Sequence, residues 1–201
     1  MNIERALAVD GWLTELEAAY LAQLASESLV AIEVGSWLGR STCAIAANIQ
    51  GYVWAVDTWK GSAEHVPMLA DKPSDWLYER FLANTQGLPV FPLMLSSVDA
   101  AVLFRRTGTR ADMIFIDANH TYESVKADIE AWMPLLVDGG VLCGHDFDPV
   151  YWPGIVQAVK ECVPKFRVVP NTTMTLRQHM RRIAPQRENF TENLRGRNES
   201  Y

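Results

Sequence analysis

Cysteine is scarce in this chain. Its three cysteines, Cys43, Cys143 and Cys162, include no C-x-x-C pair among 201 residues. An odd number without paired spacing argues against a disulfide framework. Cys43 and Cys143 lie within apolar segments, which predicts buried thiols.

Long apolar runs are also missing. No segment approaches the length needed to cross a bilayer, and residues 1–5 lack the apolar stretch of a signal peptide. We therefore expect a cytoplasmic location and no membrane partner.

Positive charge is in deficit: 18 Lys and Arg stand against 24 Asp and Glu, a formal net charge of -6. This balance argues against a nucleic-acid partner held by bulk electrostatics. The exception is residues 177–201, where six Arg stand against three Glu. The length fits one domain, so we predict a domain over residues 1–179 and a basic, mobile tail over residues 180–201.

Apolar runs and amphipathic segments alternate along the rest of the chain. Runs buried on both faces, separated by helices, predict an open α/β sheet of mostly parallel strands. A final hairpin around Pro170-Asn171 predicts an antiparallel strand at one side. The expected strands are 30–34, 52–56, 90–95, 112–116, 141–144, 166–169 and 172–176. The expected helices are 13–24, with Thr14 as N-cap, 41–49, 75–82, 97–104, 122–136 and 152–163. Residues 60–72 are expected to be irregular, and residues 138–140 to break the chain.

A glycine turn joins the first expected strand to its helix, in the sequence AIEVGSWLGRST over residues 31–42. Gly35 allows the chain to turn where a side chain would clash, and Gly39 allows the helix to approach the strand or a ligand. Amides at the helix start favour polar ligand groups. The loop is either a nucleotide-binding loop or a plain turn. Trp37 stands where a dinucleotide-binding loop would have a second glycine.

Asp57 ends the second expected strand, 22 positions after Gly35. A carboxylate there is placed to accept both hydroxyls of a ribose. The alternative is that Asp57 caps the loop that follows it. The aromatic residues Trp37 and Trp59 follow the first two strand ends and are candidates to line a ligand cavity.

Two acids and two histidines follow the ends of two later strands: Asp117 and His120, then His145 and Asp146. Ligands of open α/β sheets bind outside the carboxyl ends of the strands, so these groups are expected to share one cleft. Such a set suits Mg²⁺, Mn²⁺ or Zn²⁺. A histidine among them is also suited to deprotonate a substrate hydroxyl, and local capping is the alternative.

Four stretches together resemble the class I S-adenosylmethionine-dependent methyltransferases: residues 33–42, 56–59, 115–132 and 139–146. The closer likeness is to the macrocin O-methyltransferase and cephalosporin hydroxylase-like enzymes. It covers roughly residues 11–176. The resemblance implies a Rossmann-like, open, mostly parallel seven-stranded sheet with helices on both faces and an antiparallel terminal hairpin.

The resemblance also implies roles for individual residues. Glu33, Gly35 and Ser36 would contact the methionine part of S-adenosylmethionine, Asp57 its ribose, and Ser97 would lie near its adenine. The expected cofactor-binding set is Glu33, Gly35, Ser36, Gly39, Ser41, Asp57, Thr58, Ser97 and Asp117.

For the reacting groups, the resemblance implies that Asp117 and Asp146 bind Mg²⁺ or another divalent metal and that His120 is a general base. His145 stands where some relatives carry a second acid. It is therefore both a candidate metal ligand and a second catalytic candidate.

These features predict methyl transfer from S-adenosylmethionine to a hydroxyl of a small molecule, such as a sugar, a polyketide or a phenol. The partners expected are a small-molecule acceptor and a second copy of the chain in a homo-oligomer. The alternatives are an NAD-dependent oxidoreductase and a non-catalytic cofactor-binding module of the same fold.

Overall fold

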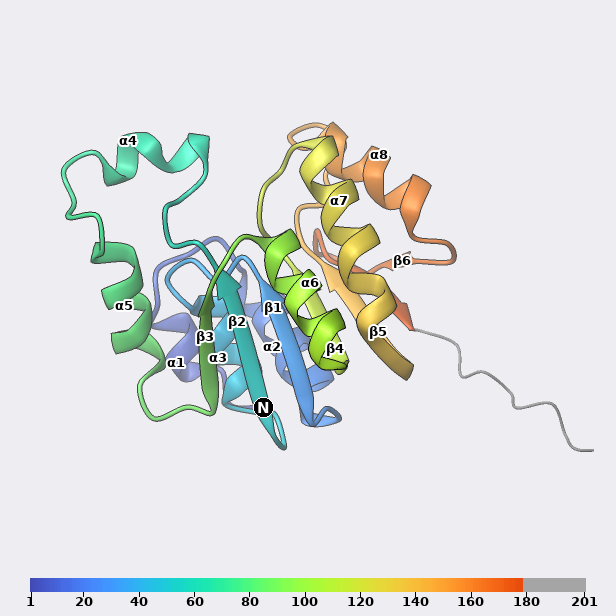
Figure 1. The fold of residues 1–201 in the computed structure, drawn as a ribbon, viewed down its shortest axis with the longest axis horizontal. Coiled ribbons are helices and arrows are strands. Elements are labelled where there is room, and N and C mark those ends of the chain that lie inside the picture. Colours follow the sequence, from blue (N-terminus) through green and yellow to red (C-terminus); the bar gives the residue numbers. More distant parts are fainter. Residues whose placement is uncertain (179–201) are drawn as a thin grey trace, which may run out of the picture.

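The computed structural model describes residues 1–178, so the tail predicted over residues 180–201 lies outside the described part. A seven-stranded sheet in the order β3-β2-β1-β4-β5-β7-β6 forms its centre (Figure 1). Strands β1 to β5 are parallel, and β7 is antiparallel to β5 and β6. The strands are β1 Val30–Val34, β2 Tyr52–Asp57, β3 Val90–Met94, β4 Ala111–Ile116, β5 Leu136–Gly144, β6 Arg167–Val168 and β7 Thr175–Gln178. The predicted sheet and its antiparallel hairpin are confirmed.

Helices cover both faces of the sheet. In Figure 1, α6, α7 and α8 lie in front of the strands, and α1, α2 and α3 lie behind them. No helix in residues 1–178 is long and apolar enough to span a membrane. The helices are α1 Glu4–Leu7, α2 Glu15–Ser26, α3 Arg40–Ala46, α4 Val66–Leu69, α5 Trp76–Thr85, α6 Ser97–Thr107, α7 Tyr122–Trp132 and α8 Pro153–Cys162.

Strand β1 shows why the apolar runs are continuous. Ala31 belongs to the core under α2 and α3, whereas Ile32 and Val34 belong to the core under α6 and α7. Both faces of the strand are therefore removed from water, and every position except Glu33 is apolar.

The two glycines of the β1–α3 loop have separate packing roles. Gly35 has φ 89, and a Cβ there would lie 2.0 Å from the carbonyl oxygen of Asp117. Gly39 has φ 90, and its Cβ would lie 3.1 Å from atoms of Phe81 and Thr85 on α5. Gly35 thus lets the ends of β1 and β4 approach each other, and Gly39 lets α3 approach α5.

The helix expected over 122–136 is shorter in the structure. Helix α7 ends at Trp132, and a 3-10 turn over Met133–Leu135 follows, with Pro134 unable to continue an α-helix. Strand β5 then begins at Leu136 and includes residues 138–140, which were expected to break the chain. The β4–β5 register shifts between Ala111 and Met113, so the glycines lie within an irregular part of the ladder.

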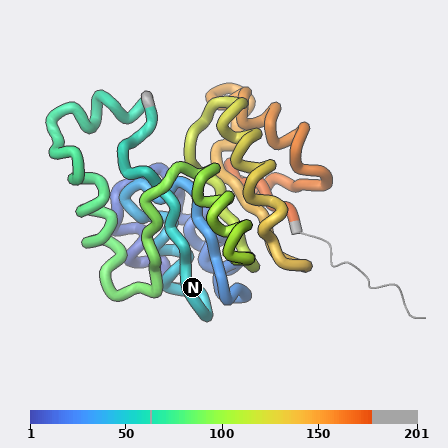
Figure 2. The backbone as a smooth tube through the Cα atoms, in the orientation of Figure 1, coloured from blue at the N-terminus to red at the C-terminus, as the bar shows by residue number. Residues whose placement is uncertain are grey.

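Residues 60–72 were expected to be irregular, but part of this segment is helical. It contains a 3-10 turn over Ala63–His65 and the short helix α4. In Figure 2 the backbone between β2 and α5 extends away from the sheet before it returns. This excursion brings Glu64 and His65 to the carboxyl ends of the strands.

Candidate functional site

Two cavities lie side by side at the carboxyl ends of the strands. The larger, about 510 Å³, extends from the β1 and β2 ends to α6 and α7. The smaller, about 350 Å³, lies between the start of α2, α4 and the end of β5. Five residues line both cavities: Gly35, Trp37, His65, Asp117 and Ala118. The cavities therefore meet at the ends of β1 and β4.

The expected cofactor residues divide between these cavities. Gly35 and Asp117 border both. The larger cavity also has Asp57, Thr58 and Ser97, and the smaller also has Ser36 and Ser41. Glu33 and Gly39 border neither cavity.

Asp57 binds backbone amides as well as bordering the larger cavity. Its Oδ2 accepts from the amides of Ser36 and Trp37, each at 2.9 Å, and its Oδ1 accepts from the amide of Trp59 at 2.7 Å. Trp37 and Trp59 have φ 48 and 49, a left-handed conformation that side chains other than glycine rarely adopt. A carboxylate accepts about four hydrogen bonds, so one position remains on Oδ1. Three of the four hydrogen-bond positions of Asp57 are therefore used for loop capping, which was the alternative to ribose binding.

Glu33 is fully buried beside the smaller cavity rather than exposed to it. The Thr42 hydroxyl donates to its Oε2, and its Oε1 has no hydrogen-bond partner. Burial raises the pKa of Glu33 from 4.5 to about 7, although the hydroxyls of Ser41, Thr42 and Ser36 lower it. A direct contact between Glu33 and a ligand would require movement, whereas Ser36 and Ser41 border the cavity, although the Oγ of Ser36 is itself buried.

Ser97 lines the larger cavity and belongs to a hydrogen-bonded group that sequence analysis missed. Its hydroxyl donates to Asp128 and accepts from Nε1 of Trp132 at 2.8 Å. Asp128 is buried, and burial raises the pKa of its carboxyl from 3.8 to about 6 despite the Ser97 hydroxyl. The sequence signal that could have identified Asp128 is its place on the same helix face as the apolar residues Val125 and Trp132.

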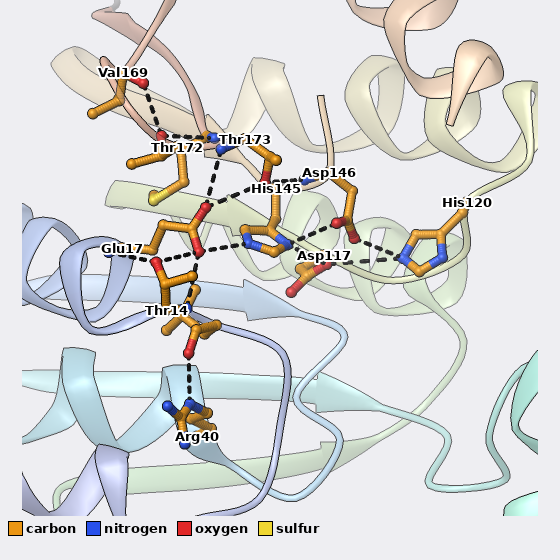
Figure 3. Close-up of polar contacts among 12 residues, drawn as sticks. Thr14, Glu17, Arg40, Asp117, His120, His145, Asp146, Val169, Thr172 and Thr173 are labelled. Atoms are coloured by element: carbon orange, nitrogen blue, oxygen red, sulfur yellow. Dashed lines mark hydrogen bonds and ion pairs between the residues drawn. The ribbon is translucent and has the colours of Figure 1, made fainter. Parts of the chain in front are cut away.

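The two acids and two histidines after β4 and β5 come together as expected (Figure 3). The Asp146 carboxylate lies 3.2 Å from Nε2 of His120 and 3.2 Å from Nδ1 of His145. Asp117 Oδ1 lies 4.0 Å and 3.8 Å from the same two nitrogens. All four side chains border the smaller cavity.

Each histidine also faces a carboxylate that sequence analysis missed. Nδ1 of His120 lies 2.9 Å from Glu64, and Nε2 of His145 lies 3.2 Å from Glu17. Glu17 is nearly inaccessible to solvent and accepts hydrogen bonds from the amides of Thr14 and Thr173. The capping box that starts α2 thus places a carboxylate behind His145.

These contacts change the protonation of the cluster. Burial lowers the pKa of His120, but Asp117 and Asp146 outweigh burial and raise it to about 10. Burial likewise lowers the pKa of His145, but Asp146, Glu17 and Asp117 raise it to about 11. Burial alone would raise the pKa of Glu17, but His145 and Thr14 lower it to about 2. Both imidazoles are therefore protonated on both nitrogens and positively charged at neutral pH in this arrangement.

Negative charge is in excess around the smaller cavity. Four carboxylates (Glu17, Glu64, Asp117, Asp146) face two imidazolium groups, and Arg40 also borders the cavity, which leaves one negative charge. Ligand atoms of Asp117, His120 and Asp146 lie within 4.8 Å of one another. The two carboxylates suit a divalent ion such as Mn²⁺ or Mg²⁺, and His120 could join them only after it loses its second proton. His145 lies outside this group and contacts Asp146 from behind.

Aromatic side chains form much of the remaining wall of the smaller cavity. Trp37 and His65 have ring centroids 4.2 Å apart, and Trp12 lies 5.9 Å from Trp37. Trp152 packs against His120 at 4.3 Å. Trp12 is 61% exposed, which is unusual for a tryptophan. Trp59, by contrast, is buried against α5 and borders neither cavity.

Comparison with known proteins decides the family. A family model described as a methyltransferase domain matches residues 32–147, more than half of the chain. The chain belongs to this methyltransferase family. The match covers the strand ends that carry Asp57, Asp117 and Asp146, so the family expected from the motifs is confirmed. The match gives the oxidoreductase alternative no support.

One curated relative matches part of the chain. The chain is 29% identical over 120 residues to protein y4gI of Sinorhizobium fredii, and this stretch covers 57% of the chain and 13% of y4gI. The chain therefore spans a small part of the length of that relative.

Solved structures share the fold. The calicheamicin methyltransferase CalS11 has a TM-score of 0.61 and 17% identity, with 83% of this chain and 80% of CalS11 covered. The O-methyltransferase from Bacillus cereus, in complex with SAH, has a TM-score of 0.57 and 17% identity, with 87% and 89% covered.

Proposed function

We propose that the protein transfers a methyl group from S-adenosylmethionine to a hydroxyl of a small molecule. The observation that carries this proposal is the meeting of two cavities at Gly35 and Asp117. The larger has room for a nucleoside between apolar and hydroxyl-bearing walls. The smaller contains the acid–histidine cluster. A methyl donor that extends from one cavity to the other would present its reactive carbon to an acceptor beside that cluster.

The adenosine part of the cofactor would occupy the larger cavity. Thr58 and the remaining acceptor position of Asp57 would face the ribose, which is therefore held by one carboxylate oxygen instead of two. The methionine part would extend toward Ser36, whose Oγ has no hydrogen-bond partner, and Ser41. The excess negative charge around the smaller cavity would favour the sulfonium.

The acceptor would bind in the smaller cavity. Trp12, Trp37 and Trp152 offer flat apolar faces, against which sugar or phenolic rings pack well. One structural neighbour, CalS11, is described as a TDP-rhamnose 3'-O-methyltransferase. A sugar hydroxyl is therefore the first acceptor to test, followed by phenols and polyketides.

We propose that Asp117 and Asp146 would hold a divalent cation, which when bound lowers the pKa of a coordinated hydroxyl. His120 borders the acceptor cavity and is more accessible than His145, with side chains 16% and 6% exposed. We therefore assign proton removal to His120. Asp117 and Asp146 raise its pKa, so their commitment to a cation would lower that pKa and free the imidazole to accept a proton. We assign orientation of Asp146 to His145, which Glu17 holds on its other side.

Calorimetry with S-adenosylhomocysteine tests the proposal. Binding in the micromolar range, with no comparable binding of NAD, is the expected result, and no binding to folded protein would overturn it. A second assay measures methyl transfer to a panel of nucleotide sugars, phenols and polyketides, with and without EDTA. Binding without transfer to any acceptor would favour the non-catalytic module. Full activity in EDTA would remove the cation from the proposal.

Two further expectations remain predictions. The homo-oligomer is tested by the mass of the protein in solution, and the cytoplasmic location by fractionation of cells that express it.

A further inference from the structure

Asp128 is a buried acid beside the larger cavity. It lies on α7, is only 4% exposed, and is one of the residues that line the cavity. Its Oδ1 accepts the hydroxyl proton of Ser97, but no described residue donates a hydrogen bond to its Oδ2. A carboxylate oxygen that opens into a cavity and has no donor from the described residues can accept a hydrogen bond from a ligand.

The surroundings of Asp128 indicate what kind of donor fits. The walls of the larger cavity also include the apolar residues Leu95, Val98 and Ala127. Ser97 has already committed its only proton to Asp128, while its oxygen accepts from Trp132. Apolar walls combined with an unoccupied hydrogen-bond acceptor suit an aromatic ring that bears an amino group.

Other acids at this cavity are less suited to the same task. Asp57 is occupied by three backbone amides, and Asp117 lies where the two cavities meet. Glu123 also lines the cavity, but its side chain is exposed to water, which competes for its hydrogen bonds. Asp128 combines burial with an open acceptor position.

We propose that Asp128 recognises the 6-amino group of the cofactor's adenine, with Ser97 and Trp132 holding the carboxylate in place. This inference rests on the proposed function, because it requires S-adenosylmethionine in the larger cavity. It changes the role expected of Ser97, which orients Asp128 rather than donating to adenine.

The test compares two ligands that differ at one position. S-Inosylhomocysteine carries a carbonyl oxygen where S-adenosylhomocysteine carries the 6-amino group, and that oxygen would face Oδ2 of Asp128. We expect calorimetry to show S-adenosylhomocysteine binding about 10- to 100-fold more tightly to the native protein, the usual effect of opposing two acceptors in a buried site. Equal affinities would overturn the inference.

Two variants separate recognition from packing. Asp128→Asn keeps an oxygen for the Ser97 hydroxyl and adds an amino group that can face a carbonyl, so the preference should fall to within about threefold. Glu123→Gln removes the exposed acid of the same cavity and should keep the native preference. A role in packing alone predicts that Asp128→Asn lowers stability and leaves the ratio of affinities unchanged.

The outcomes also separate this inference from the proposed function. If the native protein binds neither ligand, the proposed function and the role of Asp128 are both refuted. If it binds both ligands equally, cofactor binding stands and the role of Asp128 falls. Should Asp128→Asn fail to fold, the comparison on the native protein still decides.

Discussion

Replacement of Glu33 by Gln should make the protein more stable at high pH. Glu33 is fully buried with one unpartnered oxygen, and burial raises its pKa from 4.5 to about 7. One pKa unit corresponds to about 1.4 kcal/mol, so ionised Glu33 costs the folded state about 3 kcal/mol. The amide in Glu33→Gln would keep an oxygen for the Thr42 hydroxyl and would carry no charge.

The sign of the pH dependence follows from proton binding. Between pH 4.5 and about 7 the unfolded chain has released the Glu33 proton and the folded chain retains it. The folded state then binds more protons, so its stability falls as pH rises through this window. Above this pH window the loss of stability is complete. Below it, native Glu33 is neutral in both states, so the native protein and Glu33→Gln differ little in stability. The advantage of Glu33→Gln should grow by about 2 to 3 kcal/mol from pH 5 to pH 8.

Urea unfolding of both proteins across this range measures the difference directly, because other titrating groups are shared and cancel. Glu27→Gln, an exposed acid at the end of α2, is the control and should give a difference independent of pH. A stability difference between Glu33→Gln and the native protein that does not change with pH would show that Glu33 is not held protonated by burial.

Three further changes test the site. Asp57→Ala leaves the amides of Ser36, Trp37 and Trp59 without acceptors, so S-adenosylhomocysteine should bind at least about tenfold more weakly by calorimetry; unchanged affinity contradicts this. Asp146→Asn should weaken Mn²⁺ binding by about tenfold or more in an electron paramagnetic resonance titration, whereas exposed Asp99→Asn should not. Glu17→Gln keeps the Thr14 cap but leaves the His145 charge short of a partner, so urea unfolding should show a loss of about 2 to 4 kcal/mol. Exposed Glu15→Gln is its control, and a loss equal to that of the control would refute the ion-pair argument.

Much of the fold was predictable because its signals are local. Each central strand is an apolar run that two layers of helices cover, and Thr14 has the side chain that a helix N-cap requires. The errors arose where local signals conflict. Gly139 and Gly140 indicate a break, yet pairing with β4 holds them within β5.

The candidate site was predictable only at its centre. Asp117, His120, His145 and Asp146 follow parallel strands, and the strand-end rule alone brings them together. No strand-end pattern identifies Glu17, Glu64 or Asp128. Each lies on a helix or in the segment between β2 and α5, and the position of these elements depends on packing. Asp128 in particular has the pattern of an ordinary helical residue until Ser97 of α6 is placed beside it.

The sequence by itself determined the alternation of strands and helices, the glycine turn and the acids and histidines at the strand ends. Only the tertiary structure decided what those groups do. It assigned Asp57 to three backbone amides, separated Glu33 and Gly39 from both cavities, and placed Glu17 and Glu64 behind the histidines. The physical reason is that hydrophobic periodicity is a property of neighbouring residues, whereas the partner of a polar group depends on how distant segments pack.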